Sequence, residues 1–544
     1  MRDKKVLGAS LGTCVHVAGI YRFLTLAERF GYKGVFLGPA CSPEKVIAAV
    51  QKEHPLMVIV GYRLTPHVAK ELFEELKNLV TQHSLSHLVW ILSCTPQVAS
   101  VAKEIGLFKY IFTGKESFSE IVASLTTYRE QETEKLYPQT LPERIRAKHP
   151  FPLLRHHFGL PSVEETVEGV RRISEARVVD VISLGPDQNA QEFFFEPQKM
   201  NEAHKGAGGV PLRRKEDLVA IFEASRTGNF PLLRCYSGTN RLKEWAHLLH
   251  ETIRIAWGAV PIFWYSELDG RSQRPLPQAI EENLEAMRTY IELGVPLEVN
   301  DAHQWSLRDA PDSVAVASFF LGAYIAKKLG ARYYVAQYML NTPPGISPRA
   351  DLAKMLAKRD LITRLEDENF TIFTQIRGGL AHFSPHLEMA KGQLAASTFL
   401  GLFLKPHIIH VVNFSEGDHL ACPEEVIESA HIVQGVLKDA LFDLPDITKD
   451  AFIEEHRTRI RNEALLLLEA VQSLGKGGDP FLDPGVLSKA VKVGLFDAPH
   501  LAGNPWARGM VQTQIIDGVL YTINADGKIL PEKERLAKLK ESPL

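Results

Sequence analysis

A histidine near the start of the chain stands where a ligand-binding loop is expected. His16 lies in the segment CVHVAG, between Cys14 and Gly19, shortly after an apolar run at 6–11. Neutral imidazole is a good metal ligand. Open α/β sheets bind ligands at the carboxyl ends of their strands, so a histidine in this loop can reach a cofactor at the sheet edge. His16 is therefore our first candidate for cofactor binding.

The elements around His16 predict a parallel sheet. Short apolar runs alternate with helical patterns, which is typical of a doubly wound α/β domain. The expected strands are 6–11, 34–37, 56–60, 87–94 and 110–112. Beyond the first two helical patterns, the expected helices are 68–80, 98–105 and 117–128. We therefore predict a flavodoxin-like (Rossmann-like) domain over residues 1–134.

This stretch resembles the cobalamin-binding domain of corrinoid-dependent mutases and methyltransferases. That family carries Asp-x-His-x-x-Gly, then Ser-x-Leu, then Gly-Gly. His16 and Gly19 match the first motif, and Leu64 and Thr65 fall at the second. The resemblance implies that His16 binds the cobalt of cobalamin in place of the cofactor's own lower base, and that Gly19 lets the backbone approach the nucleotide tail.

Three positions depart from the family pattern. Cys14 replaces the aspartate, Tyr62 replaces the serine, and Ser93-Cys94 lies near the expected Gly-Gly. An aspartate would fix the histidine tautomer, whereas a thiol is a much weaker partner. The alternative is a flavodoxin-like domain whose histidine is a capping or core residue. The predicted cofactor contacts in this domain are Cys14, His16, Gly19, Tyr62, Leu64, Thr65, Ser93, Cys94 and Gly114.

Composition excludes several classes of protein. The 544 residues suggest two or three domains, and a net charge of −3 gives no support for binding to nucleic acid or an anionic membrane. The five cysteines are widely spread without a CxxC pair, so neither a zinc site, a disulfide framework nor an iron-sulfur cluster is indicated. Without a signal peptide or a long apolar run, we expect a cytoplasmic protein with a small-molecule substrate.

The chain changes character after residue 129. Residues 129–149 are charged and contain prolines, which predicts an interdomain linker that we place at 135–150. A second α/β alternation follows. Its expected strands are 178–184, 231–236, 260–265, 297–300, 333–337, 370–375 and 407–413, and its clearest helices are 241–255, 276–293, 313–329 and 386–404. Seven recognisable strands predict a (β/α)₈ TIM barrel over 151–445, with one strand missed.

A C-terminal extension is expected over 446–544. It begins with a long amphipathic helix at 448–473. Residues 511–529 alternate in hydropathy around the turns Asp517-Gly518 and Asp526-Gly527, which favours a β-hairpin. The charged residues 532–540 read as a solvated terminus.

Residues 150–530 resemble the large, barrel-forming subunit of glutamate mutase (methylaspartate mutase). The closest passage, 474–509, contains Leu-Gly-Lys-Gly, then Lys489-Ala490, then Gly494, Asp497 and Pro499 in the family's order. The Gly378-Gly379 pair fits as well. The resemblance implies an adenosylcobalamin-dependent mutase in which a cobalamin domain and a barrel share one chain.

Polar side chains just after the predicted barrel strands are the candidate site residues. The resemblance places the family's three carboxylate-binding arginines at Arg155, Asp187 and Tyr236, so we expect a substrate other than glutamate, such as a monocarboxylate or a cationic amine. For catalysis we predict Asp187, Glu267, Asp269 and Arg271. For substrate binding we predict Arg155, Gln188, Asn189 and Tyr236. For cofactor binding in the barrel we predict Gln375, Arg377, Gly378, Gly379, Asn413 and Glu416.

Each of these candidates has a structural alternative. Asp187 could cap a helix, the loop from Glu267 to Arg271 could be a local salt-bridge network, and Gly378-Gly379 could be a tight turn. The adjacent histidines His156 and His157 would point apart on regular structure, so we do not expect them to bind a metal together.

The leading hypothesis is an adenosylcobalamin-dependent radical isomerase, a carbon-skeleton mutase. A corrinoid methyltransferase is the first alternative, and the start of the cobalamin domain close to Met1 counts against it. A non-catalytic cobalamin carrier or sensor is the second. An aminomutase that also uses pyridoxal phosphate would need a lysine at a strand end, and none stands out. By resemblance we expect a possible homodimer.

Overall fold

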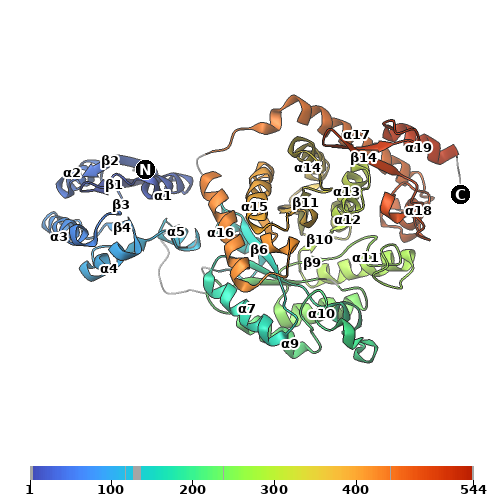
Figure 1. Cartoon of the computed structure of the whole chain (residues 1–544), viewed down its shortest axis with the longest axis horizontal. Coiled ribbons are helices and arrows are strands. Elements are labelled where there is room, and N and C mark those ends of the chain that lie inside the picture. Colours follow the sequence, from blue (N-terminus) through green and yellow to red (C-terminus); the bar gives the residue numbers. More distant parts are fainter. Residues whose placement is uncertain (1–3, 117, 126–136, 237, 441–442, 542–544) are drawn as a thin grey trace. The chain divides into compact units, whose positions relative to one another are not determined.

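The computed structural model describes residues 4–116, 118–125, 137–236, 238–440 and 443–541. The chain forms two compact units (Figure 1). The first unit comprises residues 1–136 and 437–444, and the second comprises 137–436 and 445–544. Residues 126–136, which include the end of the predicted helix 117–128 and the start of the predicted linker 135–150, lie outside the described residues.

The first unit is built on a parallel sheet of five strands. Its order is β2-β1-β3-β4-β5, which is the flavodoxin-like order, so the predicted fold class is confirmed for this unit. The strands are β1 (Lys5–Leu11), β2 (Lys33–Cys41), β3 (Met57–Tyr62), β4 (Val89–Cys94) and β5 (Tyr110–Phe112). The helices are α1 (Ala18–Arg29), α2 (Pro43–Glu53), α3 (Pro66–Gln82), α4 (Pro96–Ile105) and α5 (Phe118–Leu125).

Local sequence explains where these helices begin. Ser42 and Thr95 each accept a hydrogen bond from a backbone N–H of the first turn, and a proline follows each of them. A hydroxyl cap followed by proline is a favourable helix start, because proline lacks the N–H that would have no partner there. Strand β3 is buried along its whole length, as expected for a parallel strand between two helical layers.

The strand order creates a crevice between β1 and β3. The chain leaves β1 through α1 toward β2, and it leaves β3 through α3 toward β4 on the other side of the sheet. The connections therefore diverge at the carboxyl ends of these two neighbouring strands, which is where open α/β sheets bind ligands. The loop that contains His16 follows β1, and Leu64 follows β3.

The second unit contains eight parallel strands in a nearly closed barrel, so this part of the predicted fold class is confirmed as well. Their order is β8-β7-β6-β13-β12-β11-β10-β9. The strands are β6 (Leu153–Phe158), β7 (Val181–Leu184), β8 (Leu232–Cys235), β9 (Gly258–Ala259), β10 (Leu297–Glu298), β11 (Tyr333–Leu340), β12 (Thr371–Gly378) and β13 (Ile408–Val411).

Helices surround the barrel strands (Figure 1). They are α7 (Val163–Ala176), α8 (Gln188–Phe193), α9 (Lys215–Ala224), α10 (Leu242–Ile253), α11 (Leu276–Glu292), α12 (Asp301–Ser306), α13 (Asp312–Lys328), α14 (Pro348–Ile362), α15 (Leu387–Gly401) and α16 (Pro423–Ala440). Helix α13 is buried on nearly all sides, because α12, α14 and α17 (Ala451–Gln472) pack against it.

Two barrel strands differ from the prediction. The strand missed by sequence is β6, because its interior positions carry the polar residues Arg155 and His157 instead of an apolar run. The segment 260–265 was predicted as a strand and is not one. It is apolar because it packs in the core, and the buried Asp301 carboxylate accepts hydrogen bonds from the backbone N–H groups of Ile262 and Phe263.

Helix α6 (Leu141–Lys148) occupies much of the predicted linker 135–150. Leu141 and Ile145 lie one turn apart and pack into an apolar cluster with Leu153 and Trp257. The buried apolar side chains of this helix are Leu141, Pro142 and Ile145, and charged residues surround them, so the helix has no sustained apolar face that the sequence could reveal.

The C-terminal extension contains α17, α18 (Pro484–Lys492) and an antiparallel hairpin of β14 (Gln512–Ile516) and β15 (Val519–Ile523). Residues 532–540 were predicted as a solvated terminus, but they form α19 (Glu532–Glu541). Glu532 and Arg535 in this helix form a buried ion pair, which a charge pattern alone does not reveal. Within the described part of the chain, no helix has the length and apolar character needed to cross a membrane.

Candidate functional site

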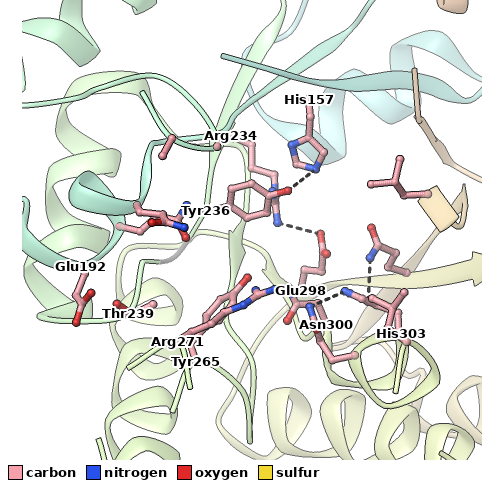
Figure 2. A pocket seen from close by; sticks show the side chains of 18 of the residues that line it. His157, Glu192, Arg234, Tyr236, Thr239, Tyr265, Arg271, Glu298, Asn300 and His303 are labelled. Atoms are coloured by element: carbon pink, nitrogen blue, oxygen red, sulfur yellow. Dashed lines mark hydrogen bonds and ion pairs between the residues drawn. The ribbon is translucent and has the colours of Figure 1, made fainter. Parts of the chain in front are cut away.

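A cavity of about 960 Å³ opens among residues at the carboxyl ends of the barrel strands (Figure 2). Strand β6 contributes Arg155 and His157, and strand β8 contributes Arg234, with Tyr236 directly after it. Catalytic groups of TIM barrels lie at this end of the strands. The cavity is therefore the candidate active site of the second unit.

One buried carboxylate lies between two arginines in this cavity. The Glu298 Oε2 atom is 3.7 Å from Arg155 Nη1 and 3.6 Å from Arg234 Nη2, and it accepts a hydrogen bond of 2.6 Å from the Trp257 indole. All three charged side chains are about 1% exposed. A buried charge needs partners, so Glu298 is the centre that holds both guanidinium groups in place.

A chain of hydrogen bonds runs across the barrel from Arg155. Its Nη1 donates to Gln375 at 2.9 Å, and Gln375 donates in turn to Gln337 at 2.9 Å. Gln337 is also 3.1 Å from His303 Nδ1. Strands β6, β12 and β11 and helix α12 are thus linked through side chains, which fixes the floor of the cavity.

The charge of the cavity differs from the sequence expectation. The described lining residues include four arginines, Arg155, Arg234, Arg271 and Arg377, but only two carboxylates, Glu192 and Glu298. The sequence analysis had predicted Arg155, Arg271 and Arg377 as site residues, but not Arg234, which reaches the cavity from β8. An excess of guanidinium groups favours an anionic ligand over a cationic amine.

Two histidines of the cavity, His157 and His303, are held neutral by their surroundings. Burial, together with Arg155 and Arg234, lowers the pKa of His157 well below its ordinary value. Burial and nearby cations likewise lower the pKa of His303 and that of His410, which packs edge-on against His157. Their imidazoles therefore act as single donors and single acceptors and not as charged groups.

Several buried polar atoms of the cavity have no hydrogen-bond partner within the described residues. They are His157 Nδ1, Arg234 Nε, Arg234 Nη1, Thr239 Oγ1 and Asn300 Oδ1. Buried polar atoms are normally paired, so a cluster of unpaired ones in one cavity marks the place of a ligand or of ordered water.

Several residues predicted from the sequence line this cavity. Arg155, Gln188, Asn189, Tyr236, Arg271 and Arg377 do so. Asn189 also exchanges two hydrogen bonds with the backbone of Asn201, so it holds the loop beside it. Arg155 was expected at the mouth and lies in the barrel interior. Gln375 lies behind the lining and orients Arg155.

Asp187 has a structural position and is not among the described lining residues. It caps α8 by accepting from the Ala190 N–H at 2.8 Å, and it also accepts from the Gly206 N–H at 2.9 Å. Arg213 binds the same carboxylate through both terminal nitrogens. Because both carboxylate oxygens already accept hydrogen bonds, Asp187 holds the loop between α8 and α9. This agrees with the structural alternative given for Asp187, a helix cap.

Glu267 and Asp269 are not among the described residues that line the cavity. Glu267 accepts a 2.6 Å hydrogen bond from Trp506 and lines a separate surface hollow. Asp269 accepts from the backbone N–H groups of Tyr265 and Ser266, so it organises its own loop. Of the four predicted catalytic residues, only Arg271 lines the cavity among the described residues.

The remaining predicted cofactor contacts of the barrel also serve local structure. A Cβ on Gly379 would lie 2.3 Å from Thr342 Oγ1, so this glycine allows two loops to meet, whereas a Cβ on Gly378 would find its nearest atom at 3.5 Å. Asn413 and Glu416 form a capping box. Burial raises the pKa of Glu416.

Sequence reasoning missed His157, Arg234, Glu298, His303 and Gln337 as cavity residues. The available signal was the period of two along a strand, since Arg155 and His157 occupy alternate positions of β6. Once β6 is assigned as a strand, both side chains are expected on the interior face.

The predicted cofactor edge of the first unit presents His16 to solvent. Its Nδ1 is 3.6 Å from the buried Cys14 Sγ, which leaves Nε2 without a partner among the described residues. A Cβ on Gly19 would lie 2.4 Å from Ser93 Oγ, so the glycine lets α1 begin close to the end of β4. These residues are brought together at one edge, as the sequence predicted.

Exposed apolar side chains flank His16. Val15 is 64% exposed, and Leu64, at the end of the neighbouring strand, is 40% exposed. Thr65 is exposed as well. Tyr62 is instead 1% exposed and packs edge-on against Phe73, so its side chain belongs to the core and not to the edge.

The other predicted contacts of this edge differ in their exposure and in their partners. Ser93 is half-buried beside Gly19, and burial raises the pKa of Cys94 to about 11, so its thiol stays protonated at neutral pH. Gly114 is exposed and donates its N–H to Glu116. No cluster of three or more His, Cys, Asp or Glu side chains among the described residues could hold a metal ion by itself.

No protein-family model and no curated protein matches the chain. Among solved structures, a cobalamin-binding protein from Desulfitobacterium hafniense DCB-2 is 21% identical over 20% of this chain and 53% of that chain, with a TM-score of 0.19. The cobalamin-dependent S-adenosylmethionine radical enzyme OxsB, without ligand, is 11% identical over 84% of this chain and 56% of its own, with a TM-score of 0.19. OxsB with aqua-cobalamin and S-adenosylmethionine bound is 11% identical over 89% and 70%, again with a TM-score of 0.19. Scores this low carry no weight for the fold or function of this chain, whose similarity to these proteins is weak.

Proposed function

We propose that the protein is an adenosylcobalamin-dependent radical isomerase, with cobalamin bound at the carboxyl edge of the first unit and substrate bound in the barrel cavity of the second. The observation that carries the proposal is the position of His16. It is an exposed imidazole whose Nε2 has no partner among the described residues, and its loop follows β1 at the switch point between β1 and β3, where open α/β sheets bind ligands.

The residues at this edge fit a cobalamin. The free Nε2 of His16 has the chemistry of an axial cobalt ligand. The exposed Val15 and Leu64 offer apolar contacts to a large, flat ring. The partner of the other ring nitrogen is the Cys14 thiol at 3.6 Å, which orients the imidazole more weakly than a carboxylate would. We therefore expect binding through histidine, with a lower basicity of the ligand than an aspartate partner would give.

When bound, adenosylcobalamin supplies hydrogen-atom abstraction by an alkyl radical. The barrel residues would then position the substrate and keep water away. Glu298 holds Arg155 and Arg234 in fixed orientations, and Gln375 accepts a hydrogen bond from the same Nη1 atom of Arg155 that lies near Glu298.

The proposal is tested by the anaerobic visible spectrum of the apoprotein after addition of adenosylcobalamin. We expect His16→Ala to weaken binding and to change the spectrum, because the axial nitrogen is lost. His67→Ala is the matched control, since His67 is an exposed histidine of α3 in the same unit, with its side chain 86% exposed. Identical spectra and affinities for His16→Ala and the unaltered protein would contradict the assignment. Equal binding of methylcobalamin, with methyl transfer and no radical signal, would favour the methyltransferase alternative.

A further inference from the structure

Two side chains of the barrel cavity carry buried donor atoms that have no partner among the described residues. Arg234 is 1% exposed, and its Nε and Nη1 atoms find no acceptor within the described residues. His157 Nδ1 is likewise buried and unpaired. Both residues pack against the ring of Tyr236, with the Arg234 guanidinium 5.6 Å and the His157 ring 4.9 Å from its centroid. The unpaired donors therefore gather around one aromatic side chain.

The neighbours of His157 determine its tautomer. Arg155 Nη2 is 3.1 Å from His157 Nε2, and a guanidinium can only donate a hydrogen bond. The Nε2 atom must therefore be the acceptor, and in a neutral imidazole the proton then resides on Nδ1. The Tyr236 hydroxyl, 3.0 Å from the same Nε2, is also oriented as a donor. His157 is thus fixed as an Nδ1–H donor that has no acceptor among the described residues.

Protonation of His157 would place an Nε2–H opposite the Arg155 guanidinium, so the geometry disfavours the charged form. Burial and the surrounding cations lower the pKa of His157 well below its ordinary value. The titratable and charged groups that face it from the neighbouring strands are Arg155, His156, Arg234, Tyr236, Arg377 and His410. None of them supplies a negative charge at neutral pH that would favour an imidazolium.

We propose that His157 and Arg234 form the anion subsite of the cavity, which binds a carboxylate or phosphate group of the ligand through His157 Nδ1–H and the free N–H groups of Arg234. This subsite deepens the proposed function, on which it rests, by assigning the substrate an anionic oxygen group. The surplus of arginines over carboxylates in the lining supplies the favourable field. Because His157 stays neutral, it contributes direction and selectivity, and Arg234 contributes the charge.

The test measures binding of succinate and of inorganic phosphate by calorimetry, without any cobalamin. His157→Gln and His157→Asn are a matched pair. The Gln amide reaches the position of Nε2, so it can keep the acceptor for Arg155 and Tyr236 while it loses the Nδ1 donor. The Asn amide reaches the position of Nδ1, so it can keep the donor. We expect His157→Gln to weaken binding about tenfold or more and His157→Asn to weaken it less. A purely structural role predicts the reverse order.

The pH dependence gives a second readout. We expect the affinity of the unaltered protein for succinate to be constant between about pH 6 and pH 8, because a neutral donor does not titrate there. Binding that strengthens as the pH falls through this range would overturn the neutral-donor assignment. Equal affinity of His157→Gln and the unaltered protein, or no binding of either anion at millimolar concentration, would overturn the subsite. Which of the two anions binds identifies the group as carboxylate or phosphate.

These measurements separate the two proposals. Loss of anion binding with intact binding of adenosylcobalamin would remove the subsite and leave the proposed cofactor site in place. Anion binding without any binding of cobalamin would remove the proposed cofactor site and leave the anion subsite in place. Arg234→Met tests the charge, and its folding is checked by the melting temperature before its affinity is compared.

Discussion

Replacement of Glu298 by glutamine tests the electrostatic centre of the barrel. The substitution keeps the size of the side chain and an oxygen that can accept from the Trp257 indole. It removes the negative charge that lies 3.7 Å from Arg155 and 3.6 Å from Arg234. Two buried guanidinium groups would then lose their shared counter-charge, while the rest of the packing is preserved.

The expected loss of stability follows from these distances. At an effective dielectric constant of about 20, each ion pair corresponds to about 4.5 kcal/mol of gross attraction. Removal of the carboxylate also removes its own desolvation penalty, which is several kcal/mol. Breaking a buried pair in this way typically costs about 3–5 kcal/mol, and we expect Glu298→Gln to lower the free energy of unfolding of the second unit by that amount.

Urea denaturation followed by tryptophan fluorescence measures this effect. Five of the six tryptophans lie in the second unit, so the signal reports mainly on the barrel. Glu285→Gln is the matched control, because Glu285 pairs with Lys243 at 2.8 Å in a solvent-exposed setting. The control should leave the midpoint unchanged. A Glu298→Gln midpoint equal to that of the control would refute the view that Glu298 holds the two arginines.

Three further predictions concern residues other than Glu298 and its two arginines. Asp187→Asn should lower the free energy of unfolding, measured by urea denaturation, by about 1–3 kcal/mol while anion binding in the cavity persists; loss of binding with full stability would instead support a catalytic role. Gly379→Ala should destabilise the barrel by about 1–3 kcal/mol, because the added Cβ would lie 2.3 Å from Thr342 Oγ1. Gly378→Ala is the control and should be tolerated, since its nearest atom would lie at 3.5 Å. Equal losses of stability in the two variants would refute this packing argument. Burial lowers the pKa of Lys358 to about 7, so the unfolded chain binds the extra proton and stability should rise with pH from about 7 to about 10. Lys358→Met should remove that rise, and an unchanged slope of the free energy of unfolding against pH would contradict it.

The fold was predictable where burial produces continuous apolar runs. The central strands β1 and β3 of the first unit are buried on both faces, and their hydrophobic pattern, together with the helical patterns between the strands, was sufficient to predict the sheet. The missed strand β6 shows the limit of this reasoning. Arg155 and His157 are polar residues on the inside of the barrel, stabilised by partners from distant strands that a local pattern does not contain.

The candidate site was predictable only in part for a related reason. Sequence reasoning chose polar clusters in the loops that follow strands, and such loops also need polar residues for helix caps and turns. Asp187 and Asp269 have that role here. Arg234 and Glu298 instead lie within strands and meet across the barrel, so their pairing depends on tertiary structure. The position of the His16 loop could be predicted because strand order alone places it at the edge where open α/β sheets bind ligands.

The most direct test of the central claim is the electron paramagnetic resonance spectrum of the protein loaded with cobalt(II) cobalamin, recorded with natural and with nitrogen-15-labelled histidine. If His16 binds the cobalt, we expect a nitrogen hyperfine splitting whose multiplicity changes with the label. We expect this splitting to be absent from the spectrum of His16→Ala. A splitting that is identical in the labelled and unlabelled proteins would show that no protein histidine binds the cobalt, and it would contradict the assignment of His16.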